Sequence, residues 1–252
     1  MNKKNRLLLV IGAAWLIANG SGPVYAQATT STIPPASVTF TGNVSVVSDY
    51  VFRGLSFSDE DPVLQGGVDV EWHKGFYVGI WGSGVDKPFG AVYNKIGGDE
   101  DFEYDLYAGW HSSGNKKVVF DLGAIRYGFE PDDDDLSWTE VYASAKAYGL
   151  KLQLNSRVEG ADMGNYIELS YFRAIKNLFD IKLHAGHWDL DRERLGTTSY
   201  SDFSIGVGKT YKGFRFELSY TGTDDDGKTR YGRFADDRAV LFIGKQFKLG
   251  SR

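Results

Sequence analysis

The sequence contains no cysteine among its 252 residues and only 4 histidines. Without cysteine, disulfides cannot stabilise the fold, and thiol redox chemistry and thiolate metal sites are excluded. Proline is also scarce, at 6 residues, whereas aromatic residues make up 15% of the chain and glycine occupies 31 positions. Aromatic side chains favour strands and proline interrupts them, so this composition indicates an all-β protein.

Long hydrophobic runs are missing as well. The longest run, from Leu7 to Ala18, has about 12 residues, and a transmembrane helix needs about 20. The mean hydropathy is −0.30, and a helical membrane protein is therefore excluded. A soluble β-protein and an outer-membrane β-barrel both stay open, because strands that alternate apolar and polar residues hide a lipid-facing surface from mean hydropathy.

Residues 1–26 have the features of a signal peptide for export. Lys3, Lys4 and Arg6 precede the apolar run, and Val24-Tyr25-Ala26 resembles a cleavage site. No cysteine follows the run, which excludes lipoprotein processing. We predict cleavage after Ala26, followed by a flexible leader over residues 27–37 that is rich in threonine, serine and proline.

The rest of the sequence alternates apolar and polar residues. This pattern predicts about 12 strands of about 10 residues, the length of a tilted transmembrane strand. The predicted strands lie near residues 39–52, 63–72, 76–86, 101–111, 117–129, 137–148, 150–160, 165–175, 179–189, 199–211, 214–223 and 237–247. Alternation alone does not separate a barrel from a soluble sandwich, in which the apolar faces would turn inward.

The connections between these strands alternate in length, which favours the barrel. The short connections are 73–75, 112–116, 148–149, 176–178 and 211–213, and the long ones are 56–62, 87–100, 130–136, 161–164, 190–198 and 224–236. Outer-membrane barrels have short periplasmic turns and longer extracellular loops. We predict a closed antiparallel transmembrane β-barrel over residues 38–247, with long acidic extracellular loops and a short C-terminal extension over residues 248–252.

Aromatic residues gather at the predicted strand ends. Near the short turns lie Trp72, Phe76, Trp110, Tyr148, Phe179, Tyr211, Phe214 and Phe247. Near the long loops lie Tyr50, Phe52, Phe102, Tyr127, Phe129, Trp138, Tyr166, Trp188, Tyr200 and Phe203. Amphipathic rings partition to membrane interfaces. We interpret the two groups as aromatic belts at the two surfaces of a membrane.

Charged residues occupy the other face of the strands. A charge on the lipid face near the membrane midplane costs about 2–4 kcal/mol, so these side chains are predicted to line the lumen. An acidic wall would contain Asp69, Glu71, Glu103, Asp105 and Asp121, and a basic wall Lys146, Lys151, Arg157 and Lys182. Facing walls of this kind would set a transverse field across a water-filled channel. The alternative is a plugged lumen in which the charges form ion pairs, assisted by Glu159, Glu168 and Asp180.

Three further residues are candidates for a rim or a constriction. Asp49 and Arg53 could form a gate pair at the extracellular rim, or they could pin the first strand to its loop and to the last strand. Trp81 is predicted to face the lumen, opposite lipid-facing Ile80, where it could narrow the pore or fill space.

Motifs for catalysis and metal binding are absent. His184 and His187 are three residues apart in a strand and therefore point to opposite faces. Asp189, Asp191 and Glu193 begin like a calcium loop, but Arg194 stands where the turn needs glycine. No Gly-x-Ser-x-Gly elbow is present. We predict no enzyme activity, no metal site and no cofactor. The net charge of −5 also argues against nucleic acid as a partner.

Two segments resemble a known family. Residues 48–54, of sequence SDYVFRG, are followed by Asp61-Pro62 and by QGGVD at 65–69, and FYVGIWGSGVD fills 76–86. These blocks are similar to the start of the TorF family of porins. Looser likeness continues through Glu103 to Trp110 and Thr139 to Tyr142. The resemblance implies an outer-membrane barrel with a channel function, and it supplies no substrate or catalytic residue.

The sequence therefore predicts a porin-like channel in the bacterial outer membrane. Small polar or charged solutes would diffuse passively through a narrow, charge-lined lumen, and outer-membrane lipid and lipopolysaccharide would surround the barrel. Two alternatives stay open: an outer-membrane enzyme acting on lipid or lipopolysaccharide, and a closed structural or adhesive barrel. The oligomeric state and the transported solute stay open too.

Overall fold

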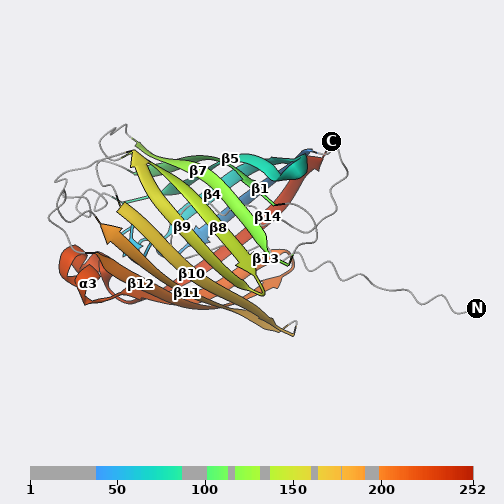
Figure 1. Cartoon of the computed structure of the whole chain (residues 1–252). Helices are drawn as coiled ribbons and strands as arrows, with labels where there is room; N and C mark the ends of the chain where they lie inside the picture. The colour runs from blue at the N-terminus through green and yellow to red at the C-terminus, as the bar shows by residue number, and fades with distance from the viewer. Residues whose placement is uncertain are drawn as a thin grey trace, which may run out of the picture.

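A computed structural model describes residues 38–86, 101–112, 117–130, 137–159, 164–176, 178–190 and 199–251. The predicted signal peptide and leader lie outside these residues. The described chain folds as one closed barrel of 12 antiparallel strands, in which each strand pairs with its neighbours and β1 pairs with both β4 and β14. The all-β barrel prediction is confirmed. Figure 1 shows the strands inclined to the barrel axis, with α3 at the end opposite the C-terminus.

The wall of the barrel contains long strands. They are β1 (Val38–Val47), β4 (Val63–Trp72), β5 (Phe76–Gly84), β6 (Phe102–His111), β7 (Val119–Glu130), β8 (Trp138–Ala147), β9 (Leu150–Glu159), β10 (Gly164–Ile175), β11 (Phe179–Leu190), β12 (Tyr200–Tyr211), β13 (Phe214–Thr223) and β14 (Arg238–Ser251). Most of them agree with the predicted ranges within two residues. The last strand continues beyond Phe247 to Ser251, where it pairs with Thr39 at the start of β1.

Shorter elements join the strands. A two-stranded sheet forms from β2 (Val51–Phe52) and β3 (Leu55–Ser56), a 3₁₀ turn covers His73–Gly75, and α3 (Asp225–Tyr231) continues into a 3₁₀ turn at Gly232–Ala235. The helix begins where the Asp224 carboxylate accepts a hydrogen bond from the Gly227 N–H at 3.0 Å. We call the end of the barrel that carries β2, β3 and α3 the long-loop end, and the opposite end the short-turn end.

The outer surface of the barrel is apolar and its interior is polar. On β13, Phe216 and Leu218 are 41% and 59% exposed, whereas Arg215 and Glu217 are buried. The same inversion runs round the wall, so charged side chains point into the lumen and aliphatic ones point away from it. A soluble sandwich would bury the aliphatic face. The barrel therefore presents the surface that a lipid bilayer requires.

The prediction of an aromatic belt at the long-loop end is wrong. The group near the short turns lies on the outer surface, as expected. At the long-loop end only Phe102 and Phe203 are exposed there, at 44% and 39%. The other eight rings of that group are at most 7% exposed and pack inside the lumen: Tyr50, Phe52, Tyr127, Phe129, Trp138, Tyr166, Trp188 and Tyr200. Inside the barrel, rings of the wall such as Tyr127 and Trp188 pack against a segment of chain that enters the lumen, which is described below.

No helix among the described residues is long and apolar enough to cross a bilayer.

Tyrosine rings in the lumen lie close against glycines of neighbouring strands. A Cβ atom on Gly79 would collide with the ring of Tyr107, one on Gly123 with Tyr142, and one on Gly186 with Tyr166. Each glycine thus leaves space for a large ring on the adjacent strand, which compensates for the missing side chain. This packing fixes both the register of the strands and the direction of the rings.

Substitution of Gly123 by alanine should destabilise the barrel. The added methyl group has to displace Tyr142, and overpacking of this kind costs about 1–3 kcal/mol. Urea unfolding in detergent micelles, followed by tryptophan fluorescence, measures the effect. Gly250→Ala is the matched control, because a Cβ at Gly250 meets nothing within 4 Å. Equal unfolding midpoints for the two variants would contradict the proposed packing.

Candidate functional site

The segment between β1 and β4 enters the lumen at the long-loop end. Its hairpin, β2–β3, places Phe52 5.8 Å from Tyr127 on β7 and 6.3 Å from Trp188 on β11, measured between ring centroids. Phe52, Leu55 and Phe57 are each at most 1% exposed. A hairpin that contacts widely separated strands of the wall lies inside the barrel. We call residues 48–61 the plug.

The tip of the plug is a tight turn. Arg53 and Gly54 both have positive φ, at 49° and 81°, which is the signature of a two-residue type I′ turn. Gly54 approaches the wall so closely that a Cβ would lie 2.7 Å from Cβ of Asp202 and from Cγ2 of Thr223. Tyr148 and Lys212 have the same conformation in the short turns, so the positive φ of Arg53 is a property of the turn. What distinguishes Arg53 is the set of contacts that its side chain makes.

Those contacts come from the opposite wall. The Arg53 guanidinium donates two hydrogen bonds to the carboxylate of Glu140 on β8, at 3.0 and 2.6 Å. Its centre lies 4.2 Å from the ring centroid of Tyr166 on β10 and 4.6 Å from that of Trp188 on β11. Arg53 and Glu140 are each 1% exposed. A bidentate ion pair between aromatic faces is among the strongest anchors that arginine can form.

The base of the plug is held by a second set of contacts. The Asp49 carboxylate accepts hydrogen bonds from Ser56 at 2.6 Å and from Arg238 on β14 at 2.9 Å. Asp49 and Arg53 are therefore not partners of one another. Asp49 links the first strand to its own connection and to the last strand, whereas Arg53 reaches across the lumen to Glu140.

The segment that follows β13 borders the plug. Arg233 pairs with Asp59 of the plug at 2.5 Å, and Tyr231 packs against Tyr200 of the wall with centroids 5.5 Å apart. The Thr223 hydroxyl donates to the carbonyl of Ala235 at 3.0 Å. The plug and α3 therefore lie together at the long-loop end of the lumen.

The five carboxylates of the predicted acidic wall lie on the interior face of β4, β6 and β7. Asp69 accepts from Tyr107 at 2.5 Å, Asp121 from Tyr77 at 2.7 Å, and Glu71 contacts His111 at 3.0 Å. Glu103 accepts from Tyr50 of the plug at 3.3 Å, and neither oxygen of Asp105 has a hydrogen-bond partner among the described residues. Strands β4 to β7 contain one lysine or arginine, Arg126, and its partner Glu159 is 67% exposed on the outer surface.

The four cations of the predicted basic wall also face the lumen, and three of them have acidic neighbours on the same side. Lys151 pairs with Glu168, Lys182 with Glu217 at 2.6 Å, and Arg157 approaches Glu140 at 3.9 Å. Asp180 pairs with Arg215 at 2.5 Å. Positive charge on this side is therefore locally compensated, whereas the acidic wall is not compensated by lysine or arginine from its own strands.

The remaining predicted residue, Trp81, lies on the interior face of β5 and is 5% exposed. Its ring centroid is 5.6 Å from that of Tyr50 in the plug. Nearer the short-turn end, the hydroxyl of Tyr77 on β5 contacts that of Tyr142 on β8, on the interior side of the wall. Both the plug and this tyrosine pair narrow the interior. Sequence reasoning did not find Glu140, Tyr166, Trp188 and Trp138 as a site.

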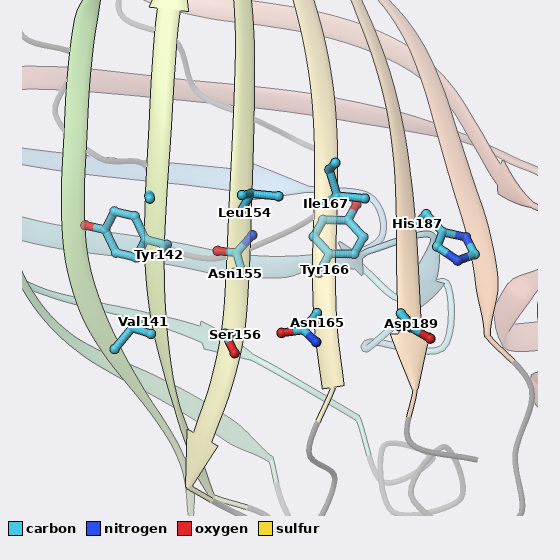
Figure 2. Close-up of a pocket in the computed structure, with 11 residues that line it drawn as sticks. Val141, Tyr142, Leu154, Asn155, Ser156, Asn165, Tyr166, Ile167, His187 and Asp189 are labelled. Carbon is cyan, nitrogen blue, oxygen red and sulfur yellow. The ribbon is translucent and has the colours of Figure 1, made fainter.

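The structure also bears on the enzyme alternative. No group of three potential metal ligands occurs among the described residues. His184 faces the lumen and contacts Asp202 at 2.9 Å, while His187 is on the outer surface, 3.0 Å from the Ser201 hydroxyl. His187 and Asp189 line a pocket of about 800 Å³ together with Val141, Leu154 and Ile167. Figure 2 shows how these side chains lie. Asp189 accepts a hydrogen bond from Ser199 at 3.2 Å instead of orienting His187. A Ser–His contact without an orienting carboxylate is a weak basis for hydrolysis.

The closed barrel with a polar interior is the fold of porins. The structure is similar to the solved structure titled "KdgM porin", with a TM-score of 0.54 and 6% identity over 84% of this chain and 99% of that one. It is also similar to "KdgM porin in complex with disordered oligogalacturonate", with a TM-score of 0.51, 7% identity and coverages of 84% and 99%. A NanC porin structure gives a TM-score of 0.50, with 9% identity and coverages of 84% and 100%.

Residues 31–247 match the family described as "Bacterial protein of unknown function (Gcw_chp)", and the chain belongs to this family. No curated protein sequence matches the chain.

Replacement of Arg53 by alanine should release the plug. Loss of one partner of a buried ion pair costs about 3–5 kcal/mol, and the plug tip then has no bidentate contact with Glu140. Hydrogen exchange of the amides of residues 50–58 should become faster. Arg215→Ala, which removes another buried ion pair near the short turns, should leave that exchange unchanged. Unaltered protection in Arg53→Ala would show that the plug is held by other contacts.

Proposed function

We propose that this protein is a channel of the bacterial outer membrane that admits small polar solutes, with a preference for cations, and that the plug closes it in the conformation described. The apolar outer surface, the porin fold and the likeness of residues 48–54 to the TorF family support this proposal. The proposal orients the barrel with its short-turn end towards the periplasm and its long-loop end towards the exterior. Lipid and lipopolysaccharide would surround the barrel.

The acidic wall is the observation that carries the solute preference. Five carboxylates line one side of the lumen, and no lysine or arginine of β4 to β7 shares that face. A low-dielectric wall with charge of one sign raises the local concentration of the opposite ion. Oligogalacturonate, named with one KdgM structure, is a polyanion. The acidic wall opposes a solute of that kind, so we infer a different substrate class here.

Removal of the plug should open the channel. We expect that replacing residues 51–56 by two glycines gives discrete current steps in planar bilayers, several-fold larger than any given by the unaltered protein, because the β2–β3 hairpin with Phe52, Arg53 and Leu55 no longer occupies the lumen. A matched deletion in the segment 225–231 tests whether loss of any segment at this end has the same effect. Absence of steps from the plug deletion at high salt would refute the channel.

Neutralising the acidic wall should change ion selectivity. In the plug-deleted protein, replacement of Asp69, Glu71, Glu103 and Asp105 by their amides should move the reversal potential in a KCl gradient towards that of an anion channel. Asp225 and Asp226 are exposed at the start of α3, and their replacement by asparagine serves as the control. The cation preference is wrong if the reversal potential of the wall variant equals that of the control.

A further inference from the structure

The part of the wall that holds Arg53 has the composition of a receptor for a cation. Glu140 supplies a carboxylate, and Tyr166 and Trp188 supply two aromatic faces, all three at most 3% exposed. Carboxylate and aromatic groups together recognise guanidinium and alkylammonium ions. We propose that this wall site, Glu140–Tyr166–Trp188, binds a solute with a guanidinium group, and that Arg53 of the plug occupies the site as an internal competitor.

The site is built by the wall and does not depend on the plug. The indole N–H of Trp138 donates to Glu140 at 3.2 Å, and Arg157 lies 3.9 Å from the same carboxylate oxygen. Arg157 itself stacks on Trp138, with its centre 4.4 Å from the ring centroid. These neighbours come from β8 and β9, so they keep the carboxylate in place when the plug leaves. Preorganisation of this kind favours binding of a replacement ligand.

Guanidinium fits better than a compact ammonium ion. The two oxygens of Glu140 each accept one N–H of Arg53, at 3.0 and 2.6 Å, and this geometry requires a planar fork of donors. The plane of such a fork also stacks on aromatic rings, as Arg53 does on Tyr166 at 4.2 Å. A lysine-like solute would present a single point charge to this geometry.

A free ligand has two advantages over Arg53. The tip residue must hold a left-handed backbone conformation, which costs energy that a free solute does not spend. In addition, Nε of Arg53 is buried without a hydrogen-bond partner among the described residues, whereas a free guanidinium can turn to place its donors differently. Binding of the solute and insertion of the tip exclude each other, so the ligand shifts the population towards the released plug.

The proposal has two parts: binding of the solute, and opening of the channel by that binding. The second part rests on the channel function proposed above, and the first part does not. A solute with a guanidinium group would open the pore by replacing Arg53, and the acidic wall would then be exposed to it.

Binding is tested by chemical rescue. The purified full-length barrels of the unaltered protein, Arg53→Ala and Glu140→Gln are titrated with methylguanidinium chloride, with sodium chloride at equal ionic strength as the reference. The thermal unfolding midpoint and tryptophan fluorescence are recorded. Arg53→Ala should be stabilised at the lowest concentration, because its site lacks the competitor. The unaltered protein should need several-fold more ligand, and Glu140→Gln should not respond.

Two results would overturn the binding proposal. One is an equal response of all three proteins, which would mark a non-specific effect of the salt. The other is a response of ethylammonium chloride as large as that of methylguanidinium. If Arg53→Ala does not fold, Arg53→Lys replaces it, because a single ammonium should compete less well than the native guanidinium. Arg215→Ala serves as the matched control, and its titration curve should coincide with that of the unaltered protein.

Gating is tested in planar bilayers. Methylguanidinium should increase the open probability of the unaltered protein and leave the plug-deleted protein unchanged. If the plug-deleted protein conducts and methylguanidinium has no effect on the unaltered one, the gating proposal fails while the channel stands. If no variant conducts, the channel itself fails, and the rescue experiment still decides whether the site binds guanidinium.

Discussion

The apolar outer surface determines where most charged side chains of the described strands lie. Because lipid excludes charged groups, the side chains that alternate with the aliphatic ones must turn into the lumen, where little solvent reaches them. Most of these buried charges have a polar partner among the described residues, of two main kinds, and Asp105 is an exception. On β8 to β13, cations pair with nearby acids, as Lys182 does with Glu217 at 2.6 Å. On β4 to β7, three carboxylates accept hydrogen bonds from tyrosines: Asp69 does so from Tyr107 at 2.5 Å, Asp121 from Tyr77 and Glu103 from Tyr50.

Because the two sides differ in this way, the distribution of charge across the lumen is asymmetric. Ion pairs on one side cancel most of their own field, whereas the tyrosine hydroxyls on the other side bring no positive charge to the carboxylates that they contact. Tyr107 can approach Asp69 because Gly79 leaves room for its ring, so glycines in the wall contribute to its electrostatics. The plug crosses between the two sides: Tyr50 donates to Glu103 on β6 at 3.3 Å, and Arg53 binds Glu140 on β8 at 2.6 Å.

Periodicity and loop lengths were sufficient to predict the barrel, its strand count and most strand ends, because alternation along a strand directly reports the two faces of the wall. The same reasoning placed eight aromatic residues at a membrane interface, although they lie inside. Alternation by itself places these rings inside, because Tyr127 has the parity of lumen-facing Asp121 on β7 and Tyr166 that of Glu168 on β10. The error came from grouping the rings by their distance from the strand ends and not by the face that they occupy. The first strand was also extended to residue 52, although it ends at Val47. The sequence did contain an indication of the turn at the tip of the plug. Arg53-Gly54 has a residue followed by glycine, as do the short turns at Tyr148-Gly149 and Lys212-Gly213.

The place of the plug in the sequence has a consequence for assembly. It follows the first strand, yet its partners lie far along the chain: Glu140 is 87 residues from Arg53, Tyr200 is 147 residues away, and Arg238 is 189 residues from Asp49. Contacts between residues so distant in sequence form late, because long loops must close before they exist. The plug therefore reaches its place only after the strands that carry these partners, β8, β12 and β14, have formed. During biogenesis this barrel passes through a stage at which its interior is accessible, before its own chain seals it.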